Sequence, residues 1–254
     1  MKVLYITTTW VSIEREHFFT HNVLKGLIDR GLEITVLSLL HGADGEVAIE
    51  KTKYQTIDYY RILLDPRIPD QQTTQILKEQ FAIIKPDVIH LNGYHISELD
   101  AASELKIPVV MTVHEGGILC PGGRGFLNWN DEICNATVSQ KNCYKCCIRN
   151  FPIWRLWYIL FSCIPVNIRM KLGSIARNRK FVPIVSPALM CSDSIAEKIT
   201  FVEKLKIVSA IIVASTRLKE AFERNGIKNN LALIPHGIPN LKRYALLPVD
   251  GKIK

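Results

Sequence analysis

Short apolar segments alternate with longer segments of helical periodicity along most of this chain. The expected strands are 2–8, 32–40, 57–64, 86–92, 107–114, 209–215 and 231–237, and the expected helices are 14–31, 71–84, 96–105 and 216–226. Strands that are apolar along nearly their whole length are typical of parallel sheets with both faces covered by helices. The sequence therefore predicts an α/β fold built on a Rossmann-like, doubly wound parallel sheet.

The alternation stops between residues 115 and 150, in a long segment rich in glycine, asparagine and cysteine. A loop of this length inside a compact domain is usually functional or disordered. Four of its cysteines have the spacing C-x13-C-x8-C-x2-C: Cys120, Cys134, Cys143 and Cys146. Four thiolates with one close pair fit a structural zinc site, and the alternatives are reduced packing thiols or redox pairing. A disulfide framework is not expected, because seven cysteines are an odd number and residues 1–10 do not resemble a secretion signal.

Basic residues dominate the segment that follows this loop. The net charge is +8, and between Glu132 and Asp193 there are nine lysines and arginines and no acidic residue. Aromatic side chains suit a membrane interface and basic ones suit anionic lipid, so residues 151–180 predict adsorption to the anionic inner surface of the cell membrane. The residues expected at that surface are Trp154, Arg155, Trp157, Arg169, Lys171, Arg177, Arg179 and Lys180.

The alternative for residues 151–180 is a core helix with a basic outer face. Nucleic acid is not an expected partner, because no recognition module accompanies the charge. The longest apolar run, residues 157–166, is about ten residues long, whereas a helix that spans a bilayer needs about 20.

Polar, aromatic and glycine residues follow three of the expected strands. They are Thr9, Trp10 and Ser12 after the first strand, Asn92, Gly93, Tyr94 and His95 after the fourth, and His114, Glu115, Gly116 and Gly117 after the fifth. In open parallel sheets, ligands bind beyond the carboxyl ends of the strands. One such segment alone reads as a solvated loop, but three at the same edge predict a ligand site.

Four stretches together resemble the N-terminal half of retaining GT-B glycosyltransferases of the family-four type: KPDVIHLNGYH, IPVVMTVHEGGILCPGG, IVASTRLKEAFERNGI and LIPHGIP. The resemblance runs in order over most of the chain. It implies two Rossmann-like domains around a cleft, with the acceptor on the N-terminal domain and the nucleotide-sugar donor held mainly by the C-terminal domain. No cofactor is required for catalysis in such enzymes.

By this resemblance, His114 matches the cleft histidine that contacts the transferred sugar and supports the transition state through hydrogen bonds. A neutral imidazole can donate to a sugar hydroxyl or to a developing charge, and the alternative is a histidine held by local backbone groups. Glu115 stands where the family often has an acidic residue. The two are the expected catalytic residues.

Two departures from the family pattern bear on this assignment. The family's first loop is usually rich in glycine, which lets the backbone approach the donor phosphate. The first loop here, TTTWVSIERE, has no glycine, so hydroxyl groups would make this contact or Trp10 would stack on a sugar ring. The family's two glutamates separated by seven residues would lie beyond Lys254. Residues 1–238 are therefore expected to form the N-terminal domain, and residues 239–254 to begin a linker to a C-terminal donor domain outside this chain.

The resulting functional hypothesis is the acceptor-binding domain of a retaining glycosyltransferase, inactive alone, in the cytoplasm at the inner face of the membrane. The acceptor would be a lipid-linked glycan or a surface polysaccharide. The donor domain would come from the same protein or from a separate subunit. The alternative is a non-catalytic, metal-stabilised Rossmann-like module that binds a protein partner or an anionic surface.

Overall fold

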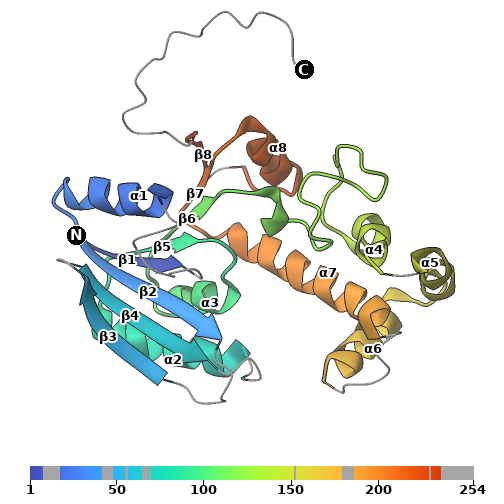
Figure 1. The fold of residues 1–254 in the computed structure, drawn as a ribbon, viewed down its shortest axis with the longest axis horizontal. Coiled ribbons are helices and arrows are strands. Elements are labelled where there is room, and N and C mark those ends of the chain that lie inside the picture. The colour runs from blue at the N-terminus through green and yellow to red at the C-terminus, as the bar shows by residue number, and fades with distance from the viewer. Residues whose placement is uncertain are drawn as a thin grey trace, which may run out of the picture.

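The computed structural model describes residues 1–7, 18–41, 48–54, 57–64, 68, 70–151, 153–178, 186–228 and 230–235. In this part of the chain eight strands form one sheet in the order β3-β4-β2-β1-β5-β6-β7-β8 (Figure 1). The strands are β1 Lys2–Thr7, β2 Glu33–His41, β3 Ala48–Tyr54, β4 Ile57–Leu64, β5 Val88–Asn92, β6 Val109–Val113, β7 Ala210–Val213 and β8 Leu231–Leu233. Every neighbouring pair except β3 and β4 is parallel. The predicted α/β, Rossmann-like sheet is confirmed.

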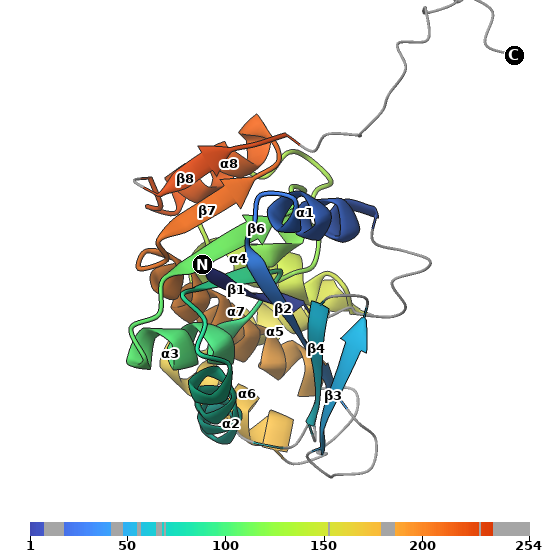
Figure 2. The ribbon, with the colours of Figure 1, turned by 90° about the vertical axis from the view of Figure 1, so that its left-hand side faces the viewer.

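Helices cover both faces of this sheet (Figure 2). They are α1 Phe18–Ile28, α2 Asp70–Ile84, α3 Ile96–Glu104, the 3-10 turn η1 Gly116–Ile118, α4 Gln140–Ile148, α5 Trp154–Ser162, α6 Val166–Asn178, α7 Ser186–Leu205 and α8 Thr216–Arg224. Successive strand side chains point to opposite faces, and β1 follows this rule. Val3 and Tyr5 pack with Leu24 of α1, whereas Leu4 and Ile6 belong to a larger core that includes α2, α3, α7 and α8.

The antiparallel edge strand β3 was not predicted from the sequence. Its central residues Glu50, Lys51 and Lys53 are exposed, so it has no apolar run that would indicate a strand. Charged side chains on an edge strand discourage pairing with another chain. Here the charges pair across the hairpin with β4, as Arg61 does with Glu50 at 3.3 Å.

The expectation that residues 115–150 are irregular throughout is wrong for their last part, which forms α4. Ser139 caps this helix, because its hydroxyl accepts a hydrogen bond from the Asn142 backbone N–H at 3.2 Å. The buried side of α4 is formed by Tyr144, Cys147 and Ile148, which pack against α7 in a separate core. This buried side contains little aliphatic surface, so no apolar periodicity in the sequence indicates a helix there.

Helix α7 is also absent from the prediction, although its 20 residues make it the longest of the described helices. Serine and charged residues interrupt its apolar pattern. No helix in the described part of the chain is both long and apolar enough to cross a bilayer. The predicted linker, residues 239–254, lies outside the described residues.

Candidate functional site

The carboxyl ends of β5 and β6 bring Asn92 and His114 together. Asn92 is the last residue of β5 and pairs in register with Thr112 of β6, and His114 follows β6 directly. The His114 Nε2–H donates a hydrogen bond to Asn92 Oδ1 at 2.6 Å. Because an amide oxygen only accepts, this contact places a proton on Nε2, so that Nδ1 is the acceptor nitrogen in the neutral form of the ring. His114 is exposed, so its ring is accessible beyond the sheet.

A buried polar layer supports this pair from within the sheet. His90 Nε2 lies 2.7 Å from Thr112 Oγ1, and its ring meets Tyr5 edge-on at 4.9 Å between centroids. Burial and, to a smaller extent, the nearby His114 lower the pKa of His90 to about 4. His90 is therefore neutral near pH 7.

The Tyr5 hydroxyl belongs to the same layer. Burial raises its pKa, which the neighbouring polar groups of Thr20 and Asn92 partly offset. The hydroxyl nevertheless makes no hydrogen bond of normal geometry to the described residues. A buried hydroxyl of this kind beside Asn92 is a polar group that a bound water or ligand could satisfy.

The turn after β5 has a conformation that only glycine adopts readily. Gly93 has φ +112°, a backbone region in which side chains are strained. Two residues later, His95 is 1% exposed, with Nδ1 2.6 Å from Glu98 Oε1 and Nε2 3.0 Å from the Asn92 carbonyl oxygen. Both partners are acceptors, so both ring nitrogens donate.

His95 is accordingly a buried imidazolium. Burial by itself lowers its pKa, but the charge of Glu98 and the hydrogen bonds outweigh burial, and the pKa of His95 is raised. The sequence analysis expected His95 to touch substrate. The structure corrects this expectation, because the ring is enclosed and both nitrogens hold the loop that carries Asn92. His95 is a positioning residue.

Tyr94 turns toward α7. Its hydroxyl donates to Glu197 Oε1 at 3.1 Å, and Lys198 Nζ lies 3.7 Å from the centre of its ring. The same ammonium group donates to the carbonyl oxygen of Ile118 at 3.0 Å, which joins α7 to the turn after β6. Burial lowers the pKa of Lys198, although Glu197 and Cys120 act against this. Tyr94 is therefore packed between elements, and the expected substrate contact could involve only its half-exposed surface.

Sequence reasoning missed Glu197 and Lys198. They lie about 80 to 100 positions from their partners along the chain, on a helix that was not predicted. No local motif marks them, and only the packing of α7 across the sheet brings them to this edge.

The remaining predicted residues of the β6 edge also have defined places. Glu115 is exposed at the start of η1. A Cβ atom on the buried Gly116 would lie 2.9 Å from the ring of Phe126, so this position has no room for a side chain. A Cβ on Gly117 would come no nearer than 3.5 Å to Glu115, so space does not demand glycine there. Thr9, Trp10 and Ser12 lie outside the described residues.

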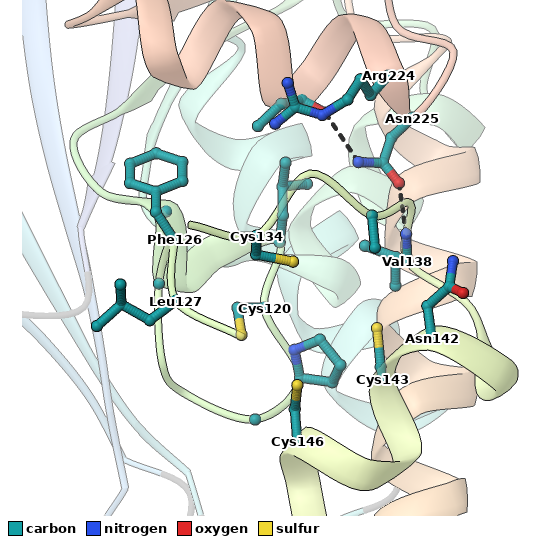
Figure 3. A pocket seen from close by; sticks show the side chains of 17 residues that line it. Cys120, Phe126, Leu127, Cys134, Val138, Asn142, Cys143, Cys146, Arg224 and Asn225 are labelled. Carbon is teal, nitrogen blue, oxygen red and sulfur yellow. Dashed lines mark hydrogen bonds between the residues drawn. The ribbon is translucent and has the colours of Figure 1, made fainter. Parts of the chain in front are cut away.

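The four cysteines of the predicted metal site line one pocket between the loop, α4 and α8, with a volume of about 50 Å³ (Figure 3). All four are free thiols. Burial raises the pKa of Cys143 to about 12, so this thiol is protonated at neutral pH. Among the described residues, no three histidine, cysteine or acidic side chains have the arrangement of a metal site. The four cysteines thus line the same pocket without the geometry of a metal site, and zinc binding stays a prediction.

The residues expected at a membrane surface divide into four groups. Trp154 and Trp157 are half-buried against α4 and α7. Arg169 is buried, with its guanidinium 4.0 Å from the centre of the Tyr144 ring, which corrects its assignment to the surface. Arg155 and Lys171 are exposed. The side chain of Arg177, together with Arg179 and Lys180, lies outside the described part.

An open, mostly parallel sheet with a polar cluster at the carboxyl ends of its central strands defines a Rossmann-like ligand-binding domain. The sequence model of Glycosyltransferase Family 4 matches residues 18–138, a range that includes Asn92 and His114. Residues 18–138 are thus similar to family 4 glycosyltransferases, and the resemblance noted from the sequence is confirmed over this range. A comparison with curated protein sequences gave no significant match.

Several solved structures are similar to this chain, with TM-scores below 0.5. An E. coli structure described as trehalose-6-phosphate bound with UDP-2-fluoro glucose has 9% identity and a TM-score of 0.45, with 89% of this chain and 42% of that chain covered. Sucrose-phosphate synthase from Thermosynechococcus elongatus has 11% identity and a TM-score of 0.46, with 93% and 48% covered. An α,α-trehalose-phosphate synthase from Burkholderia vietnamiensis has 11% identity and a TM-score of 0.44, with 89% and 44% covered. The chain thus spans less than half of each of these three proteins.

Proposed function

We propose that this chain is the acceptor-binding half of a retaining glycosyltransferase that transfers a sugar from a nucleotide-sugar donor to a lipid-linked or surface polysaccharide acceptor. The observation that carries the proposal is the His114–Asn92 pair at the carboxyl edge of β5 and β6, within the segment that matches the family. An exposed imidazole held in one tautomer suits a group that must hydrogen-bond to a sugar.

The role of His114 follows from its geometry. Asn92 fixes the ring through Nε2, and the low pKa of His90 keeps the layer below it uncharged. An oriented ring loses little freedom when a sugar binds, so its hydrogen bond stabilises the transition state more effectively than a mobile side chain would. Glu115, exposed next to it, is the nearest carboxylate in sequence that could accept from sugar hydroxyls.

The donor enters this proposal through a second domain. GT-B glycosyltransferases, which this chain resembles, hold the nucleotide sugar mainly on their C-terminal domain. That domain lies across the cleft from the acceptor side. In the proposed enzyme, the carboxyl edge of β5 and β6 is the acceptor side of that cleft. The donor domain belongs to the same protein or to a separate subunit.

The experiment is sugar transfer by the complete enzyme, measured with radiolabelled nucleotide sugars and membranes or surface polysaccharide as acceptor. We expect His114→Ala to lower kcat/KM by about 100-fold, as loss of one transition-state hydrogen bond typically does. Stability should change little, because the exposed side chain loses one hydrogen bond of about 1 kcal/mol. NMR of the product should show retention of the anomeric configuration.

Two controls make the result decisive. His90→Gln removes a buried histidine from the same edge, so it should lower stability more than it lowers turnover of the folded fraction. Equal turnover of the wild type and His114→Ala, at an unchanged melting temperature, would contradict the role of His114. Absence of transfer from every donor would favour the non-catalytic module instead.

A further inference from the structure

Helix α5 has an outer face without partners in the described structure. None of its residues is buried. Its aromatic residues Trp154, Trp157, Tyr158 and Phe161 pack inward against α4 and α7. The aliphatic side chains on the other side, Leu156, Ile159 and Leu160, are 48%, 63% and 51% exposed. The helix therefore presents its aliphatic residues to the outside, which is the reverse of a solvated helix.

Helix α6, the next helix in the chain, also exposes large apolar side chains. Of the 16 large apolar residues that are exposed in the described part of the chain, seven lie between residues 153 and 175. The seven are Ile153, Leu156, Ile159, Leu160, Val166, Ile168 and Ile175, and we call them the α5–α6 apolar face. Single exposed apolar residues need no explanation, but a concentration of this kind marks an interaction surface. Figure 1 shows both helices at the periphery, away from the β3 edge of the sheet.

The charged residues that α5 and α6 themselves carry have one sign. Arg155 of α5 and Lys171 of α6 are exposed, and the sequence has no acidic residue between Glu132 and Asp193. A protein partner could be of either charge, whereas the combination of exposed aliphatic and basic side chains complements the headgroups and the acyl boundary of an anionic bilayer. With nine residues, α5 is too short to span a bilayer and fits a helix that lies in the interface.

We propose that the α5–α6 apolar face docks on an anionic lipid surface, with Leu156, Ile159 and Leu160 inserted at the headgroup boundary and Arg155 and Lys171 near lipid phosphates. This assigns insertion to aliphatic residues, whereas the sequence had suggested Trp154 and Trp157. The docking stands on exposure and charge alone and does not depend on the proposed sugar transfer. If both hold, the surface brings the cleft to a lipid-linked acceptor.

The test is cosedimentation of the full chain with vesicles of phosphatidylcholine alone or mixed with phosphatidylglycerol. We expect binding to the anionic vesicles at low salt, and weaker binding in about 0.5 M NaCl, where charges are screened over a few Å. The double variant Ile159→Ser/Leu160→Ser should bind about tenfold more weakly, because half-exposed aliphatic chains can no longer leave water. Arg155→Gln/Lys171→Gln should remove most of the salt dependence.

A matched control removes two aliphatic chains elsewhere. Ile83 and Ile207 are 65% and 67% exposed outside the α5–α6 apolar face, so Ile83→Ser/Ile207→Ser should bind like the wild type. Failure to bind anionic vesicles at low salt overturns the proposal. An equal loss of vesicle binding in Ile159→Ser/Leu160→Ser and in the control Ile83→Ser/Ile207→Ser overturns it as well. A dimer in sedimentation equilibrium that Ile159→Ser/Leu160→Ser dissociates, without vesicle binding, would assign the face to a second copy of the chain instead.

Discussion

At the scale of single residues, the most informative group is the buried His95–Glu98 pair, because its two atoms in contact are 2.6 Å apart and almost fully enclosed. The pair fixes the turn that carries Asn92 and therefore the ring of His114. Two histidines only five positions apart, His90 and His95, have pKa values shifted in opposite directions. The presence of a carboxylate beside His95 decides this difference, since burial alone lowers the pKa of both.

We expect Glu98→Gln to lower the free energy of unfolding by about 3 kcal/mol near pH 6, because it leaves a buried imidazolium without its counter-ion. In the wild type, the raised pKa of His95 stabilises the folded state fully below about pH 6.5, and this contribution is lost as pH rises through the folded pKa. In the variant burial dominates, so stability should instead increase with pH. Urea unfolding at several pH values measures both slopes.

The control for this prediction is Glu104→Gln. Lys78 Nζ and Glu104 Oε2 are 2.6 Å apart, but the carboxylate is 56% exposed. A surface pair of this kind contributes at most about 1 kcal/mol, and its loss should not reverse the pH dependence. Parallel pH slopes for the wild type and Glu98→Gln would contradict a charged His95.

At the scale of elements, the segment of residues 115–150 consists of a turn, a loop and α4, with four thiols around one pocket. If zinc binds there, it would tie Cys120 and Cys134 of the loop to Cys143 and Cys146 of the helix. Such a link would replace the apolar core that this loop lacks, because zinc coordination contributes directly to folding.

We expect protein purified without chelator to contain about one zinc ion per chain by elemental analysis. Cys143→Ser and Cys146→Ser should each abolish zinc retention and lower the melting temperature, whereas the exposed Cys163→Ser should change neither. Chelator treatment should lower the melting temperature of the wild type and of Cys163→Ser, but not that of Cys143→Ser or Cys146→Ser. Two results together would favour packing thiols: metal-free protein that gains no zinc on titration, and four pocket cysteines that all react with a thiol reagent after unfolding.

At the scale of the whole molecule, the chain supplies one side of the proposed cleft, and it spans less than half of the three solved structures described above. The described site contains the acceptor-side residues of the proposal and none of the family's paired glutamates. We therefore expect the isolated chain to bind nucleotide sugars with a Kd weaker than about 1 mM, or a binding free energy smaller than about 4 kcal/mol in magnitude.

Isothermal titration of the chain with UDP and GDP sugars tests this expectation. The coding sequence beyond the codon for Lys254 provides the comparison. If it encodes a second β/α domain, the longer protein should bind the donor much more tightly than residues 1–254 do. Micromolar donor binding by residues 1–254 alone would contradict the division of the site between two domains.

The sequence by itself determined the class of fold, because apolar strands and intervening helices carry periodicities that local physics imposes. It also indicated which strand ends bear the proposed site, since polar residues and the glycine at position 93 mark the turns after β5 and β6. The edge strand β3 and helix α4 were not predicted from the sequence, because neither has an aliphatic pattern of its own.

Only the tertiary structure decided the surroundings of individual side chains. His95 became a buried cation because Glu98 and the Asn92 carbonyl surround it, and Arg169 lies under Tyr144 of another helix. Lys198 reached the site across 80 positions of sequence. On α5, contact with α4 and α7 turned the aromatic residues inward and the aliphatic residues outward. Each outcome depends on contacts between distant segments, which a local pattern does not encode, whereas the periodicity of strands and helices lies within each segment.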